Sequence, residues 1–195
     1  MELVFVTQNS NKIKEIKSLL PSKINLLSIK DIGLGDLDIE ETGNSFSENA
    51  IIKAMSVFEK RKIPVFAEDS GLVVPALKGA PGIYSARYAG ANATDTMNNI
   101  KLLEEMLLIQ NREAYFTTCI AFIDENSEQY LFEGRCYGSI AKNLTGKDGF
   151  GYDPLFIPDS YDKSFAELGE SVKNQLSHRS IATKKFIAFL EEHYK

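Results

Sequence analysis

The chain has 195 residues, of which 44% are hydrophobic and 25% charged, a composition typical of a soluble globular protein with a sizeable core. Its formal net charge of −5 excludes a general nucleic-acid surface, because proteins that bind phosphate backbones need clustered Lys and Arg. No apolar run approaches the roughly 20 residues of a membrane span. We therefore expect neither nucleic acid nor membrane as a partner. The length fits one domain over residues 1–195, or two lobes around one cleft.

The cysteines and the first residues indicate a reducing compartment. Cys119 and Cys136 each lie in a strand-like run and form no CxxC pair, so we expect small buried hydrophobes rather than a disulfide or zinc site. The chain enters a strand at once, without the basic, then apolar, then cleavable order of a secretory signal. Both features predict a cytoplasmic protein.

Residues 3–12 predict a short buried strand that turns directly into a helix. Residues 3–6 are apolar, and Ile13, Ile16 and Leu20 then recur at helical spacing until Pro21 ends the run. Free backbone N–H groups and the positive end of the helix dipole meet at such a helix start, which makes it a natural anion site. The alternative is an ordinary polar turn. The residues of this turn are Thr7, Gln8, Asn9, Ser10, Asn11 and Lys12.

The rest of the chain alternates strand-like and helical segments, as in an α/β protein. Ser45 and Glu48 have the spacing of a capping box and open a helix on which Asn49 and Lys53 share a face. Two later runs are joined by the turn 124–127, which predicts an antiparallel hairpin. We therefore expect a mixed sheet flanked by helices. The expected strands are 24–29, 65–67, 115–123, 129–137 and 155–157, and the expected helices are 45–60, 94–108, a short one near 164 and a long one over 171–192.

The chemistry is expected at Glu68, Asp69, Ser70 and Gly71, directly after the strand 65–67. Ligands of open α/β sheets gather at the carboxyl ends of strands. Two neighbouring carboxylates repel each other, which costs free energy unless a cation binds them or one of them takes part in proton transfer. Magnesium typically takes one or two carboxylates, and substrate phosphates and waters complete its octahedron. The alternative is a solvated turn.

Three further segments carry candidate site residues. An acid of the turn 40–43 is a plausible extra metal ligand if a metal binds elsewhere, and otherwise lies in a solvated loop. Residues 150–153 join two aromatic rings and a carboxylate to a flexible loop, which suits a flat heterocycle but also fits a packed β-turn. Lys173, His178 and Arg179 supply cations near the start of the last helix.

Taken together, these segments resemble the inosine triphosphate pyrophosphatase family, which hydrolyses non-standard purine nucleoside triphosphates. The similarity runs over nearly the whole chain, and its segments occur in order at family-like spacing. They are residues 7–12 (TQNSNK), 40–43 (EETG), 45–53 (SFSENAIIK), 67–72 (AEDSGL), 79–88 (GAPGIYSARY), 149–154 (GFGYDP) and 177–179 (SHR).

The resemblance implies an elongated two-lobed α/β fold, with a central mixed sheet flanked by helices and the active-site cleft between the lobes. It also implies a homodimer, and Mg²⁺-dependent conversion of ITP, dITP or XTP to the monophosphate and pyrophosphate. The chain departs from the family at a few positions. Gln8 stands where Gly is frequent and could alter the triphosphate turn, while Glu68 stands where many members have Asp. Lys147 and Asp148 replace smaller residues.

The resemblance also implies roles for individual residues. Asp69 resembles the general base that activates water and lies against magnesium, Glu40 a second metal carboxylate, and Glu68 a supporting acid. Lys53 and Lys173 would neutralise phosphate charge, with Lys53 among the catalytic residues. The remaining substrate-binding residues would be Thr7, Gln8, Asn9, Ser10, Asn11 and Lys12 around the triphosphate, with Ser70, and Phe150, Gly151, Tyr152, Asp153, His178 and Arg179 around the base.

A donor such as Arg179 would select hypoxanthine and xanthine, because it pairs with O6 but meets the N6 amino donor of adenine. Guanine shares O6, so its rejection must depend on its 2-amino group. Two alternatives stay open. One is a Maf-type pyrophosphatase of modified pyrimidine nucleotides, which should lack the segments 150–153 and 177–179. The other is a non-catalytic nucleotide sensor, which would not need a water-activating acid such as Asp69.

Overall fold

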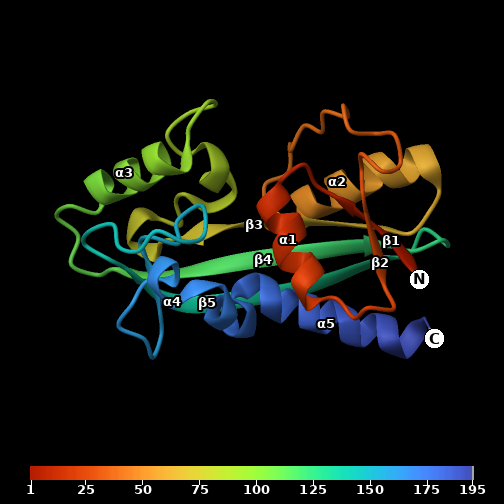
Figure 1. Cartoon of the computed structure of the whole chain (residues 1–195). Coiled ribbons are helices and arrows are strands. Elements are labelled where there is room, and N and C mark those ends of the chain that lie inside the picture. Colours follow the sequence, from red (N-terminus) through yellow and green to blue (C-terminus); the bar gives the residue numbers. More distant parts are fainter. Residues whose placement is uncertain (195) are drawn as a thin grey trace. The chain divides into compact units, whose positions relative to one another are not determined.

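The computed structural model describes residues 1–194, which form an α/β fold on one six-stranded sheet in the order β2-β1-β3-β4-β5-β6 (Figure 1). β1 pairs in parallel with β2 and β3, whereas β5 and β6 are antiparallel, so the expected mixed sheet flanked by helices is confirmed. The strands are β1 Glu2–Val6, β2 Asn25–Ser28, β3 Val65–Val73, β4 Glu113–Ile123, β5 Gln129–Ile140 and β6 Phe156–Pro158. The α-helices are α1 Ser10–Leu19, α2 Phe46–Arg61, α3 Asp95–Glu105, α4 Phe165–Leu176 and α5 His178–His193.

The chain divides into two compact units. Unit 1 contains Met1–Asp69, Thr118–Gly134 and the chain from Arg179 onward, and unit 2 contains Ser70–Thr117 and Arg135–His178. Among the helices of residues 1–194, none combines the length and the hydropathy needed to cross a bilayer.

The core of unit 1 lies on both faces of its part of the sheet. Successive side chains of a strand point to opposite faces, so β1 contributes to two separate clusters. Val4 and Val6 pack on the face that α2 covers, and Leu3 and Phe5 pack on the face that α1 and α5 cover (Figure 1). The helical partners on these two faces are Ala50, Ala54, Val57 and Phe58 of α2, Ile16 of α1, and Ala182, Phe186 and Leu190 of α5.

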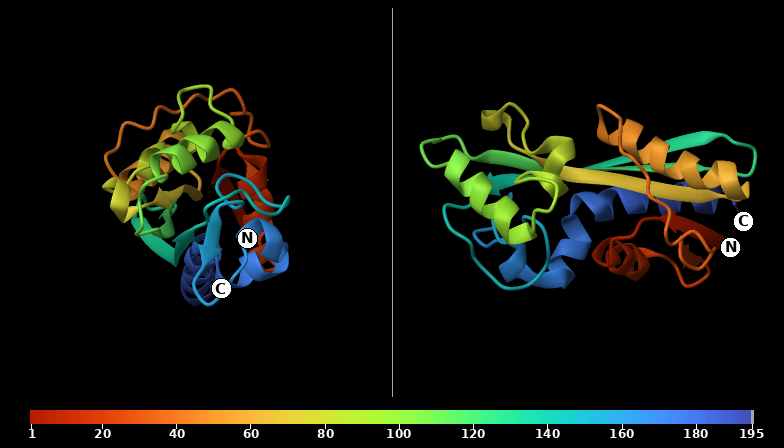
Figure 2. Two further views of the ribbon diagram at one scale, coloured as in Figure 1. Left: turned by 90° about the vertical axis from the view of Figure 1, so that its left-hand side faces the viewer. Right: turned by 90° about the horizontal axis from the view of Figure 1, so that it is seen from above.

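Unit 1 also brings together the start of β1 and the end of α5, as both views of Figure 2 show. The N-terminal ammonium donates to the carbonyl of Lys23 at 3.1 Å. Lys23 in turn pairs with Glu191 of α5 at 3.1 Å, with both side chains at least half exposed.

Unit 2 has a core of its own. Leu102 and Met106 of α3 pack there with Phe116 of β4, and Phe165 of α4 closes the same cluster. Tyr152 belongs to this cluster as well, which anchors the glycine-rich loop before β6. The other members are Leu72, Val74, Ala114, Cys136, Ile140, Leu155 and Phe156.

The two cysteines are free and buried, as expected for small hydrophobes. Cys119 is 2% exposed and Cys136 is 6% exposed. Burial is the main cause that raises the pKa of each thiol to about 12. Both therefore stay protonated at neutral pH and are poor nucleophiles.

The acidic segment 68–71 was expected directly after the strand 65–67, but it lies inside β3, which continues to Val73. Leu72, two residues from Ser70, is buried in the core of unit 2, which favours continued extension. The two acids remain in the strand because cationic side chains of unit 1 pair with both of them.

The expected single helix over 171–192 is wrong. Ser177 has extended backbone dihedrals, φ −67° and ψ 155°, so α4 ends there and α5 begins anew at His178. Serine favours such non-helical positions because its hydroxyl competes for backbone hydrogen bonds. Gly169 adds a second break, with a φ of 77° inside α4. The helix 94–108 is also shorter than expected and ends at Glu105.

Candidate functional site

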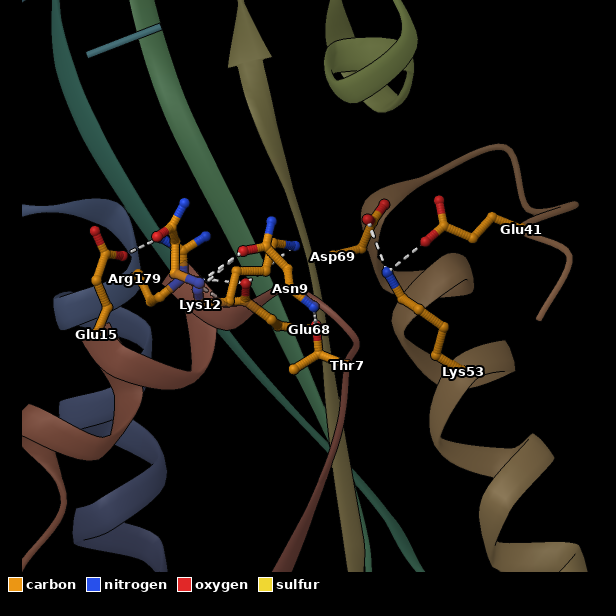
Figure 3. A network of polar contacts seen from close by, with 10 residues as sticks. Thr7, Asn9, Lys12, Glu15, Glu41, Lys53, Glu68, Asp69 and Arg179 are labelled. Carbon is orange, nitrogen blue, oxygen red and sulfur yellow. Dashed lines mark hydrogen bonds and ion pairs between the residues drawn. The ribbon is translucent and has the colours of Figure 1, made fainter. Parts of the chain in front are cut away.

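The strand register of unit 1 sets the place of the two acids. Val6, the last residue of β1, pairs with Ala67 of β3. Glu68 and Asp69 therefore follow at the level where β1 has ended and the chain turns into α1 (Figure 3). They are 2% and 6% exposed, respectively. The acids thus lie inside β3, level with the carboxyl end of its parallel neighbour β1, and ligands of α/β sheets gather at such strand ends.

The start of α1 is capped by Asn9. Its side-chain oxygen accepts from the N–H groups of Asn11 at 3.0 Å and Lys12 at 3.2 Å, and Thr7 Oγ1 accepts from Asn9 N–H at 3.1 Å. Two of the N–H groups expected for an anion are thus already bonded within the turn. The side chains of Ser10 and Asn11 are exposed there. Gln8 donates instead to the carbonyls of Gly35 and Leu37.

Glu68 is the centre of a buried chain of alternating charges. Lys12 Nζ lies 3.1 Å from Glu68 Oε1, and Arg179 Nε donates to both carboxylate oxygens at 3.0 and 2.8 Å. The other side of the Arg179 guanidinium donates through Nη1 to Glu15 on α1 (Figure 3). Burial alone would raise the pKa of Glu68, but Arg179 and Lys12 outweigh it and hold that pKa well below its usual range. Glu68 is therefore an anion.

Asp69 forms a second group with residues of α2 and the loop before it. Lys53 Nζ lies 2.9 Å from Asp69 Oδ1 and 2.7 Å from Glu41 Oε1, and Asn49 Nδ2 donates to Asp69 Oδ2 at 3.2 Å. Burial would lower the pKa of Lys53, but Asp69 and Glu41 outweigh it and raise that pKa. A charged ammonium is thus held between two carboxylates.

Asn49 also fixes the acidic turn relative to Asp69. Its side-chain oxygen accepts from Gly43 N–H at 2.9 Å. A Cβ on Gly43 would lie 2.7 Å from that oxygen, so the close approach requires glycine. Ser45 caps α2 by accepting from Glu48 N–H at 3.2 Å, and Glu48 accepts from Asn44 N–H at 2.6 Å. The predicted cap thus orients the helix that carries Asn49 and Lys53.

The two acids of the turn 40–43 occupy different surroundings. Glu40 is exposed, and the structure of residues 1–194 shows no ion pair for it. Glu41 is half-buried and contacts Lys53. The prediction of Glu40 as a metal ligand stays a prediction, and the structure adds Glu41 as the acid of this turn that joins Asp69.

Unit 2 holds a separate group around the loop 150–153. Asp153 is 2% exposed and accepts from Phe150 N–H at 2.9 Å and from Lys173 Nζ at 2.6 Å. The Lys173 ammonium also lies 4.3 Å from the centroid of the half-buried Phe150 ring, a cation–π distance. The ring and the carboxylate of the loop thus meet the ammonium of Lys173 on α4, whereas the resemblance implied that Lys173 neutralises phosphate charge. That role of Lys173 stays a prediction.

Tyr152 and His178 are buried in this unit, and their predicted place beside the base stays a prediction. The Tyr152 hydroxyl donates to the carbonyl of Ser85 at 2.8 Å, and its ring is buried in the core. The His178 ring stacks on Phe116 with centroids 4.7 Å apart and an angle of 12° between the planes. Of the two aromatic rings in the loop, only that of Phe150 is partly exposed.

Sequence reasoning missed three residues of these groups. Glu15 lies in α1 and reads as an ordinary helical acid, but it is 8% exposed and paired with Arg179. The sequence places Asn49 beside Lys53 in the family-like segment 45–53 and Glu41 in an acidic turn, but it indicates no role for either. Arg179 was expected beside the base, whereas the structure shows its guanidinium between Glu68 and Glu15 of unit 1. Its role in base recognition stays a prediction.

These three groups occur in a chain whose sequence matches a known family. The model of the Ham1 family matches residues 3–189. The chain belongs to the Ham1 family. A dITP/XTP pyrophosphatase of Christiangramia forsetii is 47% identical over 192 residues, covering 98% of this chain and 100% of the relative. The resemblance drawn from the sequence motifs is thereby confirmed.

Solved structures of the Ham1 family have the same fold. The Ham1 protein of Staphylococcus aureus superimposes with a TM-score of 0.90 at 41% identity, over 98% of this chain and 99% of that one. A HAM1 protein from Coxiella burnetii gives a TM-score of 0.91 at 40% identity, again over 98% and 99% of the two chains.

Because Glu68 pairs with both Lys12 and Arg179, we expect a large loss of stability when Glu68 is neutralised. Glu68→Gln would leave Lys12 and Arg179 buried without their shared carboxylate, so we expect the free energy of unfolding to fall by about 3–5 kcal/mol. Chemical denaturation measures this. The matched control is Glu191→Gln in the exposed pair with Lys23, where we expect a change below about 1 kcal/mol. Equal effects of the two variants would contradict the account of the network.

Proposed function

We propose that this protein hydrolyses non-standard purine nucleoside triphosphates (ITP, dITP and XTP) to the nucleoside monophosphate and pyrophosphate. The observation that carries the proposal is the buried pair Glu68 and Asp69 in β3, level with the carboxyl end of β1 and surrounded by three cationic side chains. Relatives named dITP/XTP pyrophosphatases, which the chain matches over almost its full length, support the substrate class.

Unit 1 is proposed to bind the triphosphate. Lys12 lies at the start of α1, where the helix dipole favours an anion, and its side chain is 17% exposed. Burial is the main cause that lowers the pKa of Lys12, and Glu68 opposes that shift. Ser10 and Asn11 offer exposed polar side chains in the same turn. Glu68, buried behind Lys12, serves to position this lysine.

Asp69 is proposed as the general base. A base must hold a fixed oxygen within hydrogen-bond reach of the attacking water. Lys53 and Asn49 each bind one oxygen of the Asp69 carboxylate and so fix its orientation. Its proton acceptance would create the hydroxide-like nucleophile that attacks phosphorus, with pyrophosphate as the leaving group. Lys53, beside it, would stabilise charge that develops on the phosphate oxygens.

The donor set of unit 1 fits magnesium. Four carboxylates and three cationic side chains make up the charged group of unit 1, namely Glu15, Glu41, Glu68 and Asp69 with Lys12, Lys53 and Arg179. Their net charge is negative, so the group would repel a triphosphate that arrived without a divalent ion. Magnesium takes one or two carboxylates and completes its shell with phosphates and waters.

Asp69 with Glu40 or Glu41 would hold the magnesium ion. The resemblance points to Glu40, while the contact of Glu41 with Lys53 supports Glu41. When bound, the ion would neutralise phosphate charge and polarise the phosphoryl group.

Unit 2 is proposed to bind the purine base. The partly exposed Phe150 ring offers a stacking surface, and Asp153 offers an acceptor for a ring N–H. Lys173, held against both, fixes their relative position and brings a cationic donor to the same loop. A buried donor facing a purine position 6 would favour O6 over an amino group, because an unmatched polar pair costs roughly 1–3 kcal/mol.

The two alternatives are less well supported. The segments 150–153 and 177–179 are present, and a Maf-type enzyme should lack them. A non-catalytic sensor would have no use for a buried carboxylate whose two oxygens are held by Lys53 and Asn49.

We expect purified protein with Mg²⁺ to hydrolyse ITP, dITP and XTP much faster than ATP or GTP. The reason is the proposed selection for the base in unit 2, combined with a triphosphate site that treats all nucleotides alike. Pyrophosphate and orthophosphate release should be measured separately over this nucleotide panel. Equal turnover of ATP and ITP would refute the base assignment, and orthophosphate as the first product would refute the cleavage position.

Asp69→Asn should lower turnover by roughly 10²–10⁴-fold, because it removes the basic oxygen and the charge while it keeps the shape. Steady-state kinetics measure this, and circular dichroism should show an intact fold. The control is Glu125→Gln in the exposed turn between β4 and β5, which should leave turnover nearly unchanged. If Asp69→Asn kept more than about a tenth of the turnover, the general base would be another residue, with Glu68 the next candidate.

We also propose a homodimer, which rests on the family resemblance. The chain has a mass of 21.8 kDa, so light scattering should give about twice that value. A fully active monomer at micromolar concentration would contradict this proposal.

A cytoplasmic location is proposed from the two free, buried cysteines, because disulfides are rare in reducing compartments. Fractionation of cells that express the protein tests it, with recovery outside the cytoplasm as the contrary result.

A further inference from the structure

The loop 150–153 is a β-turn whose exposed peptide groups need partners. Asp153 N–H donates to the carbonyl of Phe150 at 3.3 Å, which closes the turn. Gly151 occupies its first central position with a φ of 61°, a conformation that favours glycine. In such a turn only the outer residues bond each other, so the N–H and carbonyl of Gly151 point away from the turn.

Both groups are held by one helix. Asp95 Oδ2 of α3 accepts from Gly151 N–H at 2.7 Å, and Asn99 Nδ2 donates to Gly151 O at 2.8 Å. Asp95 and Asn99 are four residues apart, so they lie on the same face of α3, one turn apart. Asn99 Nδ2 also donates to the backbone carbonyl of Asp95 at 2.8 Å. Asp95 and Asn99 thus bind both the N–H and the carbonyl of Gly151.

Helix α3 is itself fixed within unit 2. Thr94 caps it by accepting from Met97 N–H at 3.3 Å, and Leu102 is buried in the core. Asn98 binds the neighbouring 82–89 segment, accepting from Ala89 N–H at 2.8 Å and donating to Ala86 O at 3.0 Å. The position of Gly151 is therefore set by a rigid element rather than by the loop alone.

We propose that Asp95 and Asn99 are positioning residues for purine recognition, which they support by holding Gly151 between Phe150 and Asp153. This inference rests on the proposed function of unit 2. Phe150 and Asp153 flank the held residue, and Asp153 binds Phe150 N–H, so rotation of the Gly151 peptide would move the ring and the carboxylate together. We call Asp95 and Asn99, which hold Gly151, the clamp. The clamp determines the affinity and selectivity for the base and takes no part in the reaction at phosphate.

The test compares Asp95→Ala and Asn99→Ala with wild type. Each loses a hydrogen bond that fixes the loop, so the KM for dITP and XTP should rise about tenfold. The kcat of each variant should stay within about twofold of the wild-type value. The inhibition constant of tripolyphosphate, which lacks a base, should also stay within about twofold of wild type. Asp95→Asn retains an acceptor oxygen for Gly151 N–H and should restore the wild-type KM. Thr96→Ala, on the exposed first turn of α3, is the matched control.

Asn99 is buried, so Asn99→Ala also removes packing and lowers stability. Asp95 is exposed, so Asp95→Ala tests the hydrogen bond to Gly151 without a loss of packing. A KM and a dITP-to-GTP selectivity unchanged in Asp95→Ala would overturn the clamp while the proposed function stands. Equal losses for dITP, GTP and tripolyphosphate, or no rescue by Asp95→Asn, would also overturn it, because they would show a merely structural role. Wild-type protein without preference for dITP or XTP would overturn the proposed function and the clamp with it.

Discussion

The buried pairing of Glu68 with Lys12 and Arg179 is the interaction on which the rest of unit 1 depends. A carboxylate at 2% exposure is tolerated only when its charge is matched and its oxygens are bonded. The pairing ties β3 to the start of α1 and to the start of α5, three segments far apart in sequence. It therefore fixes the geometry of the turn proposed to receive phosphates. The adjacent Asp69 gains its own fixed orientation from Lys53 and Asn49.

The two units divide the proposed recognition between two kinds of chemistry. Unit 1 offers alternating charges with a net negative balance, which suits a metal–triphosphate complex better than a bare anion. Unit 2 offers an aromatic ring, a buried carboxylate and a lysine, which suits a flat heterocycle with defined donors and acceptors. In both units the functional groups are held by side chains that would not contact the substrate, such as Asn49 in unit 1 and Asn99 in unit 2.

Local sequence patterns predicted most of the fold, together with Lys12, Lys53, Glu68, Asp69 and the loop 150–153 as candidate site residues. The turn after β1 and the cap at Ser45 follow from local physics, and the structure places both as expected. The long-range partners could not be derived in this way. Glu15 joins Arg179 across 164 positions, and Asn99 reaches Gly151 across 52. The break at Ser177 could not be located from the sequence, because serine favours non-helical positions only weakly. His178 stacks on Phe116 while Arg179 pairs with Glu68, and these tertiary contacts accompany the break.

We assign phosphate recognition to unit 1 and base recognition to unit 2. The most direct test measures the binding of a triphosphate without a base and of a nucleoside without phosphates. Calorimetry with Mg²⁺ should compare tripolyphosphate and inosine on wild type, Lys12→Ala and Phe150→Ala. The account predicts that Lys12→Ala weakens tripolyphosphate binding and leaves inosine binding unchanged, while Phe150→Ala does the reverse. Equal weakening of both ligands by both variants would contradict it.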